Sequence, residues 1–217
     1  MVYDGIHTAY DVMKEFLIAG AELTELGFPV LPPVNIRPDD TVDFEESFSR
    51  KLKGHRKLNC NFFIDDCKFT RLENAPDRYI EHLKCFHSLC GLDFSIDTQM
   101  PLVMQMYSKY RSMALDWYLY TQGIPVIPNV NIMPYSGCEW LLEGLPKRST
   151  LCCCTNGRIR AKAARMEFCE GFYGMCDRLE PLRVVVIGRM PDELNSPVEI
   201  INLKTRNQKI NEQFGGK

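Results

Sequence analysis

The sequence predicts an α/β fold with a mainly parallel sheet, arranged as a reduced or distorted TIM-barrel-like domain or, alternatively, as an open α/β sheet. Strand-like apolar segments alternate with helical segments, which is typical of parallel strands joined by crossover helices. No linker divides the 217 residues, and a closed barrel usually takes roughly 250. We therefore expect one domain over residues 1–203, followed by a flexible tail over 204–217.

The composition is that of a soluble globular protein, with 45% apolar residues, 25% charged residues and a net charge of -2. Overall charge therefore predicts neither a nucleic acid nor a membrane surface as partner. No run of about eighteen apolar residues occurs, and the N-terminal segment lacks the basic and apolar regions of a signal peptide. We expect a cytoplasmic protein without membrane association.

The ten cysteines show no metal-binding pattern. None forms a C-x-x-C pair, so neither a zinc nor an iron–sulfur signature is present. We interpret most of them as small buried apolar residues in a reducing cytosol. The four histidines show no ligand spacing, and neither a Walker loop nor a G-x-G-x-x-G motif occurs, which argues against a standard nucleotide-binding fold.

In the first half of the chain, helical patterns and Val- or Phe-rich runs alternate. We expect helices over residues 8–26, 43–53 and 76–87, strands over 28–36, 59–65 and 91–97, and loops over 38–43 and 66–75. In the second half, we expect helices over 101–122, near 138–144 and over 159–179, and strands over 124–132, 150–155, 183–187 and 198–203.

A twelve-residue repeat links the two halves. GFPVLPPVNIRP at 27–38 and GIPVIPNVNIMP at 123–134 match at eight of twelve positions. The repeat indicates either an internal duplication or a chance resemblance of two strands.

Polar residues gather on one face of three expected strands. In alternation they are Asn59, Asn61 and Asp65, then Asp93, Ser95 and Asp97, then Asn129 and Asn131. Central parallel strands are normally apolar on both faces. In a barrel the polar face would line the interior, where Asp and Asn must be hydrogen-bonded or bind a ligand. We predict Asp93, Ser95, Asn129 and Asn131 as substrate-binding residues.

Three acids fall at the carboxyl ends of expected strands, which is the edge where α/β folds bind ligands. We predict that Asp65, Asp66 and Asp97 are catalytic, as general acid and base or through a divalent cation. Asp65 and Asp97 would hold Mg or Mn. In the alternative interpretation, these acids cap the following helices and tie loops together.

A second predicted substrate-binding feature follows the strand at 150–155. Asn156, Gly157 and Arg158 form a turn into a helix, and Arg160 follows. A glycine-containing turn at a helix N-terminus can hold an anion when arginines are near, and late strand–helix loops are common phosphate sites in barrels. The alternative is a solvated basic helix face.

Three stretches carry motifs with a family likeness: FFIDDCKFTRLENAPDRYIEHL, LDFSIDTQMPLVMQMYSKYRS and QGIPVIPNVNI. Together they resemble the bacterial and phage family known as domain of unknown function 4417, over roughly residues 27–190. The chain departs from the family pattern at Leu92, where proline is expected, and at Asn131-Ile132, where a small polar residue and Trp are expected. By matching positions, the motif residues are Asp65, Asp66, Asp93, Ser95, Pro101, Tyr110, Arg111, Asn129 and Gly157.

The resemblance implies a cytoplasmic protein of a bacterium, phage or mobile element, and it carries no particular activity. It also implies a role for Arg111, which would lie mid-helix and could pair with one of the aspartates. Such a pair is compatible with a structural role or with substrate binding.

Two functions fit these patterns. The first is a metal-assisted enzyme acting on a nucleotide, a nucleic-acid end or another phosphorylated substrate at the Asp/Asn rim. The second is a non-catalytic binding protein that inhibits a host factor or joins a replication complex, using the same rim or the aromatic helix at 101–122. The sequence leaves the oligomeric state and the partner open.

Overall fold

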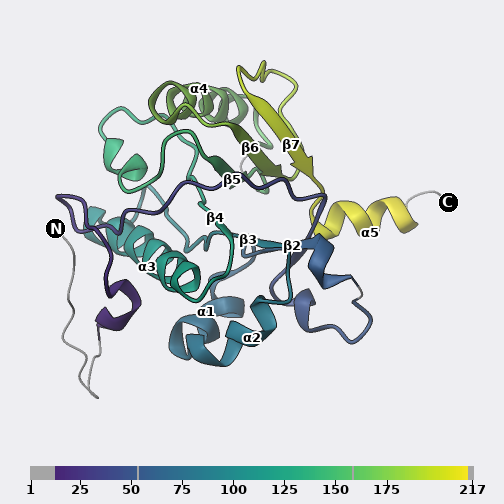
Figure 1. Ribbon diagram of the computed structural model, residues 1–217. Helices are drawn as coiled ribbons and strands as arrows, with labels where there is room; N and C mark the ends of the chain where they lie inside the picture. Colours follow the sequence, from purple (N-terminus) through teal and green to yellow (C-terminus); the bar gives the residue numbers. More distant parts are fainter. Residues whose placement is uncertain (1–12, 53, 158, 215–217) are drawn as a thin grey trace.

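The structure is a computed structural model in which residues 13–52, 54–157 and 159–214 are described. Within these residues, two parallel sheets form, with strand orders β1-β2-β3-β4 and β5-β6-β7 (Figure 1). The strands are β1 (Asp40–Asp43), β2 (Leu58–Asn61), β3 (Ser88–Cys90), β4 (Val126–Ile127), β5 (Thr150–Cys154), β6 (Arg183–Ile187) and β7 (Glu199–Leu203).

The two sheets meet just after β4. A parallel bridge joins Asn129 to Cys152 of β5, and the backbone of Cys152 exchanges hydrogen bonds with Val130 and Pro128. Pro125 and Pro128 flank β4 and lack an N–H, which explains why this strand is only two residues long. Among the described residues β7 is not paired with β1, so the strands follow in chain order without closing a barrel. The predicted parallel α/β class is confirmed, in its open form.

Five α-helices flank the two sheets in the described part of the chain, and the last of them extends away from the body of the molecule (Figure 1). They are α1 (Asp66–Asn74), α2 (Ile80–Leu83), α3 (Leu102–Thr121), α4 (Lys162–Leu179) and α5 (Arg206–Phe214). Short 3-10 turns are η1 (Glu15–Ile18), η2 (Glu46–Phe48), η3 (His55–Lys57), η4 (Pro76–Tyr79) and η5 (Glu139–Leu142). In Figure 1, α1 and α2 lie below the first sheet and α4 lies above the second.

Strands β5 and β6 of the second sheet are buried on both faces, as expected for central parallel strands, whereas the edge strand β7 is largely exposed or half-buried. Val184 and Val186 of β6 pack in the cluster that includes the core residues of α4. Val185 and Ile187, on the opposite face, pack with Cys152 and with residues of β3, β4 and β7. Six of the ten cysteines are buried, and all ten are free thiols. This agrees with the interpretation of most of them as small core residues.

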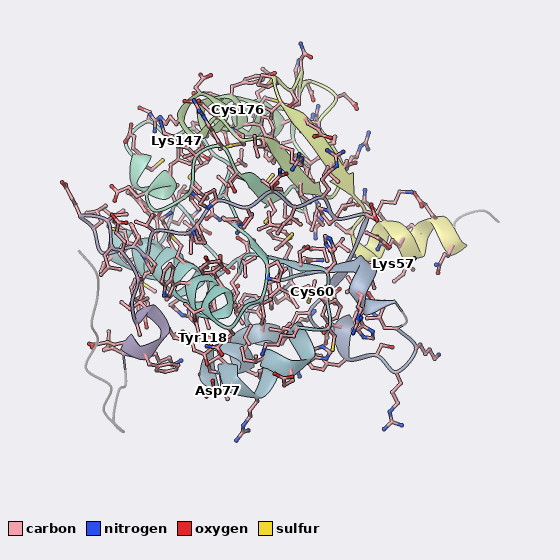
Figure 2. The ribbon with its side chains drawn as sticks, viewed as in Figure 1. Lys57, Cys60, Asp77, Tyr118, Lys147 and Cys176 are labelled. Atoms are coloured by element: carbon pink, nitrogen blue, oxygen red, sulfur yellow. The ribbon has the colours of Figure 1, made fainter. Side chains whose placement is uncertain are left out.

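Several helices and strands lie where the sequence predicts them. Helices α3 and α4 and strands β5, β6 and β7 fall inside or within one residue of their expected ranges. Long apolar periodicity and a terminating Gly123, with its φ of 79°, define α3. The hydroxyl of Tyr118 on α3 donates to the carboxylate of Asp77 in η4, so the two side chains point toward one another (Figure 2).

The N-terminal expectations were wrong where they can be compared. Of the helix expected at 8–26, residues 8–12 lie outside the described residues, and 13–26 form only η1 and turns. Residues 28–36 are extended but form no strand of either sheet, because prolines interrupt their N–H groups. Instead, the N–H groups of Val34 and Ile36 donate to the hydroxyls of Ser149 and Thr150, at the amino end of β5.

Five other assignments also differ. Strand β1 and helix α1 occupy segments expected to be loops, and the expected helix at 43–53 is reduced to η2 in its described part. The strand expected at 91–97 is displaced to β3, which ends at Cys90. The chain leaves the sheet at Gly91, where its backbone packs closely against the backbone of Asn129. A Cβ added at Gly91 would lie 2.8 Å from the backbone nitrogen of Asn129. Residues 206–214, part of the expected flexible tail, form α5.

A glycine on α4 provides a test of this packing. Gly171 lies against the backbone of Met133, whose nitrogen would be 2.7 Å from an added Cβ. Because a backbone contact cannot yield cheaply, we expect Gly171→Ala to lower the free energy of unfolding by about 2–3 kcal/mol. Gly174→Ala is the matched control, since its Cβ would meet only the Tyr135 ring at 3.4 Å. Urea unfolding of both variants measures the difference, and equal stabilities would contradict the packing.

Candidate functional site

The carboxyl ends of the strands surround a mouth made of two adjoining pockets. We call the first the acidic pocket; its volume is about 270 Å³. It is lined by Asp43, Glu45, Asn61, Phe63, Ile64, Asp65, Lys68, Asn156, Ile187, Thr205, Arg206 and Asn207. The second, the basic pocket, has a volume of about 570 Å³ and shares Asn156, Thr205 and Asn207 with the first.

The basic pocket is formed by the segments after β5, β6 and β7. Its lining residues are Thr155, Asn156, Gly157, Ile159, Arg160, Arg165, Gly188, Arg189, Met190, Asp192, Thr205, Asn207, Gln208 and Asn211. A smaller hollow of about 200 Å³ lies beside both pockets and includes Asp65, Asp93, Ser95 and Asn156. Asn156 therefore lies at the centre of the whole mouth.

The walls of the acidic pocket are fixed by hydrogen bonds. Asp43, at the end of β1, accepts from the N–H of Glu46 at 2.8 Å. Asn61, at the end of β2, donates to the hydroxyl of Thr41 at 2.9 Å and accepts from the N–H of Phe63 at 3.2 Å. Both side chains are buried and hydrogen-bonded, so they shape the pocket, and the bond from Asn61 to Thr41 also holds β2 against β1.

Asp65 faces the mouth beside a cation. Its carboxylate lies 3.2 Å from the ammonium of Lys68, which is also 3.6 Å from a carboxylate oxygen of Glu45. The hydrogen bond that the ammonium of Lys68 donates to Asp65 is the main cause that raises the pKa of Lys68. The ammonium of Lys68 thus lies between the two carboxylates and forms an ion pair with each.

The turn after β5 is held tightly to β6. The hydroxyl of Thr155 donates to the carbonyl of Arg189 at 2.8 Å, and a Cβ at Gly188 would overlap that hydroxyl. Gly157 has a φ of 78°, a left-handed conformation that favours glycine. These contacts keep the two loops side by side, so their arginines border one space.

The arginines of the basic pocket differ in their ion pairs. The Nε of Arg165 donates to both carboxylate oxygens of Glu193, at 2.9 and 3.0 Å, and this hydrogen bonding lowers the pKa of Glu193. Arg189 lies 3.9 Å from Asp192, with both side chains largely exposed. Such an exposed pair is weak, so Arg189 keeps most of its capacity to bind an anion.

The first turn of α5 completes the mouth. The N–H of Thr205 donates to Gln208 at 2.8 Å, and the N–H of Gln208 donates back to the Thr205 hydroxyl at 3.3 Å, which is a capping-box arrangement. Further along α5, the ammonium of Lys209 donates to Asp40 and to the carbonyl of Thr41. Helix α5 is therefore attached to β1 on the side where β7 and β1 are not paired.

The predicted acids separate into different environments. Asp66 accepts hydrogen bonds from the hydroxyl and N–H of Ser95, at 2.9 and 3.1 Å. Asp97 accepts from the N–H of Gln99 at 2.8 Å and lines another pocket of about 450 Å³, which shares Ser95 with the small hollow. The structure therefore does not bring Asp97 into the pockets that Asp65 lines.

Asp93 lies within an amide network. Its carboxylate accepts from the side-chain amides of Asn129 at 2.8 Å and Asn131 at 3.2 Å. The three predicted substrate-binding residues are thus brought together, as the strand pattern predicted, although 91–97 is not a strand. Of the other predicted residues, Asn156, Gly157 and Arg160 line the basic pocket, and Arg158 lies outside the described residues.

Arg111 lies away from the mouth. Its guanidinium forms a two-pronged pair with Glu73 of α1, with the Nε donating at 2.8 Å, and it stacks 3.7 Å above the Phe94 ring. The hydrogen bonding that Arg111 donates to the carboxylate of Glu73 is the main cause that raises the pKa of Arg111. This pairing ties α3 to α1, and a glutamate takes the place of the expected aspartate.

In the described part of the chain, no three His, Cys, Asp or Glu side chains are grouped so that they could hold a metal ion. A site with one or two protein carboxylates needs no such group of three. Such sites are common for Mg²⁺ when ligand phosphates supply the remaining oxygens.

Comparison with known proteins confirms the family. A family model described as "Domain of unknown function (DUF4417)" matches residues 21–204. The chain belongs to this family. The match includes all seven strands and the pocket residues that precede Thr205, whereas α5 lies beyond it.

Two curated relatives of this DUF4417 protein are phage proteins, and each is called "Gene 1 protein". The one from Mycobacterium phage L5 is 27% identical over 139 residues, covering 63% of this chain and 61% of the relative. The one from Mycobacterium phage D29 is 26% identical over 171 residues, covering 78% and 63%. The chain thus spans less than two thirds of the length of these relatives, and the family is phage-associated.

No solved structure matches the chain. Among the described residues, none of the helices combines the length and the apolar character needed to cross a membrane.

Several residues of the mouth were missed by sequence reasoning. Asp43 ends a strand that was expected to be a loop, and Asn207 belongs to the expected tail. Arg189 follows the carboxyl end of the predicted apolar strand at 183–187, and this position could have identified it as a candidate site residue. Asp116 and Lys109, whose pKa values burial shifts strongly, lie in the core on α3. The helical periodicity of the sequence does not distinguish them from the surface residues of the helix.

Asp116 and Lys109 are both almost fully buried on α3. Asp116 accepts from the N–H of Leu92 at 2.9 Å, and burial raises its pKa to about 8. The ammonium of Lys109 donates to the carbonyl of Leu141 at 2.8 Å, and burial lowers its pKa to about 7. Both groups tie loops to α3 from within the core, and neither lines the mouth.

The raised pKa of Asp116 predicts a pH dependence. Between its ordinary value of 3.8 and about 8, the folded state keeps a proton that the unfolded state releases. The free energy of unfolding should therefore fall as the pH rises through this window. Asp116→Asn carries a neutral amide throughout, so its stability relative to wild type should increase from pH near 5 to pH near 8. Urea unfolding at both values measures this, and a pH-independent difference would show that Asp116 has an ordinary pKa.

Proposed function

We propose that the protein binds a phosphorylated ligand at the mouth, with the phosphate groups in the basic pocket. The observation that carries this proposal is the convergence of Arg160, Arg165 and Arg189 on one cavity of about 570 Å³ at the carboxyl ends of β5 and β6. The planar guanidinium matches phosphate oxygens with two parallel hydrogen bonds. This edge of a parallel α/β sheet is also the usual location for ligands.

The N-terminus of α4 adds to the same field. The helix begins at Lys162, and its N-cap, Ala161, provides no side-chain hydrogen bond to the first turn. The free N–H groups and the helix dipole of an 18-residue helix both favour an anion at that end. The loop that carries Arg160 leads directly into this helix, so the dipole and the guanidinium act together.

A divalent cation, Mg²⁺ or Mn²⁺, fits the proposal on the acidic side. Asp65 lines the pocket that adjoins the basic pocket, and Glu45 reaches the same ammonium of Lys68. One or two carboxylates together with ligand phosphates satisfy Mg²⁺ in many phosphate-binding sites. Lys68 would have to swing aside when the cation binds. Asp97 lines a separate pocket and has no part in this arrangement.

The reaction of a metal-assisted enzyme at this mouth would be phosphoryl transfer or phosphate-ester hydrolysis on a nucleotide, a nucleic-acid end or another phosphorylated substrate. Asp65 would hold the cation or accept a proton from the attacking group. The second candidate is a non-catalytic binding protein of a phage or mobile element that inhibits a host factor or joins a replication complex. The internal hydrogen bonds of Asp66, Asp93 and Asp97 favour it, because these carboxylates are committed to the fold.

The proposal predicts binding of inorganic tripolyphosphate in the presence of Mg²⁺. Wild type should show a dissociation constant that rises about 10-fold or more in Arg160→Gln and in Arg189→Gln, because each loses charge-assisted hydrogen bonds. EDTA and Asp65→Asn should weaken binding in parallel. Arg178→Gln is the matched control, since Arg178 belongs to the other end of α4, 3.7 Å from Glu139. Isothermal titration calorimetry measures all five proteins.

The outcomes separate the alternatives. Affinity that is unchanged in both arginine variants, or no binding by wild type, would overturn the phosphate proposal. Binding with release of phosphate that requires Mg²⁺ and Asp65 supports the enzyme. Binding without turnover supports the binding protein.

A further inference from the structure

We propose that the ligand of the mouth is a nucleoside phosphate, with α5 contacting the base while the arginines hold the phosphates. This inference rests on the proposed function, because it takes phosphate binding in the basic pocket as given. The new element is the part of the pocket that phosphate does not explain. That part is formed by α5 and by two apolar side chains.

The basic pocket is larger than an inorganic phosphate requires. Its volume of about 570 Å³ lies within the roughly 300–1,000 Å³ that small-molecule sites usually occupy. The arginines border it from the segments after β5 and β6, and α5 borders it from the segment after β7. A ligand that fills the pocket therefore needs an anionic part and an uncharged polar part.

The wall formed by α5 carries two amide side chains. Asn207 and Asn211 are four residues apart, so they lie on the same face of the helix. In the described part of the chain, neither side chain hydrogen-bonds to another residue. An amide offers a donor and an acceptor together, and this pair matches the edge of a nucleobase in a two-pronged contact. Gln208 is different, because its side chain is committed to the Thr205 cap.

Two apolar residues offer a surface for the flat face of a base. Ile159 and Met190 line the same pocket, and both are half-buried against the core that includes α4. Methionine is polarizable and makes favourable contacts with aromatic rings. The pocket thus contains cations for phosphate, amides for a base edge and apolar atoms for a base face.

The position of α5 relative to the arginines is set before any ligand binds. The Thr205–Gln208 capping box fixes its first turn, and Lys209 attaches it to Asp40 and Thr41. Arg206 lies 3.9 Å from Glu46 as a further, weaker link. A pre-organised wall of this kind lowers the ordering cost of binding.

The charge distribution favours a mononucleotide over a nucleic-acid strand. A strand requires a continuous basic groove that follows its backbone. Here the basic pocket borders the acidic pocket, with Asp43, Glu45 and Asp65 on the neighbouring wall, and the net charge of the chain is -2. A single nucleotide fits two adjoining pockets of opposite charge. Its phosphates would contact the arginines of the basic pocket and share a cation with Asp65 of the acidic pocket.

The experiment compares nucleotides with a ligand that has only the phosphates. Tripolyphosphate, ATP, GTP, CTP and UTP are titrated with Mg²⁺ into the full chain and into the double variant Asn207→Ala/Asn211→Ala. We expect wild type to bind at least one nucleotide about 10-fold or more tightly than tripolyphosphate. The double variant should lose most of that difference while its tripolyphosphate affinity stays within about 2-fold of wild type. Gln213→Ala is the matched control, an amide on α5 that does not line the pocket.

The possible results are distinct. If tripolyphosphate binds and no nucleotide binds more tightly, the inference fails and the phosphate proposal stands. If the double variant loses tripolyphosphate and nucleotides alike, α5 supports the pocket without reading a base, which also overturns the inference. If neither ligand binds wild type, both proposals fail. A nucleotide preference that disappears in the double variant and persists in Gln213→Ala establishes the role of α5.

Discussion

The join between the two sheets determines where everything else lies. It consists of two backbone hydrogen bonds just after β4. The N–H of Val130 donates to the carbonyl of Cys152 in β5, and the N–H of Cys152 donates to the carbonyl of Pro128. Prolines on both sides of β4 remove N–H groups and allow only this narrow contact. Since all strands are parallel, the join brings the ends of β1 and β2 to the same edge as the ends of β5, β6 and β7. The acidic and basic pockets are neighbours for that reason.

The sequence predicted the elements whose signals are long or strongly apolar. Helices α3 and α4 have extended periodicity, and β6 is an apolar run that the core requires on both faces. The missed elements are short or polar. Strand β1 reads DTVD and α1 is nine residues of mixed character, so their stability comes from pairing with β2 and from packing of Phe69 and Leu72. Tertiary contacts of this kind are invisible in a local pattern.

The sequence predicted the edge of the sheet at which the candidate site lies better than it predicted which residues line the site. A polar residue at the end of an apolar strand indicated the correct edge for Asp65, Asn156 and Arg160. The same signal cannot separate a carboxylate that awaits a ligand from one that ties loops, as Asp66 does with Ser95. The wall contributed by α5 required a contact from Lys209 back to Asp40, 169 positions earlier in the chain. Pairwise contacts at such separation have no local signature.

The contribution of α5 also has a consequence for biosynthesis. The arginines of the basic pocket precede residue 190, whereas the amide wall opposite them begins after β7. During translation, the parallel strands emerge in spatial order, so each new strand finds its neighbour already made. In the sequence, β7 separates the two walls of the basic pocket. The pocket therefore becomes complete only when α5 has left the ribosome. A nascent chain therefore completes its two sheets before it completes this pocket.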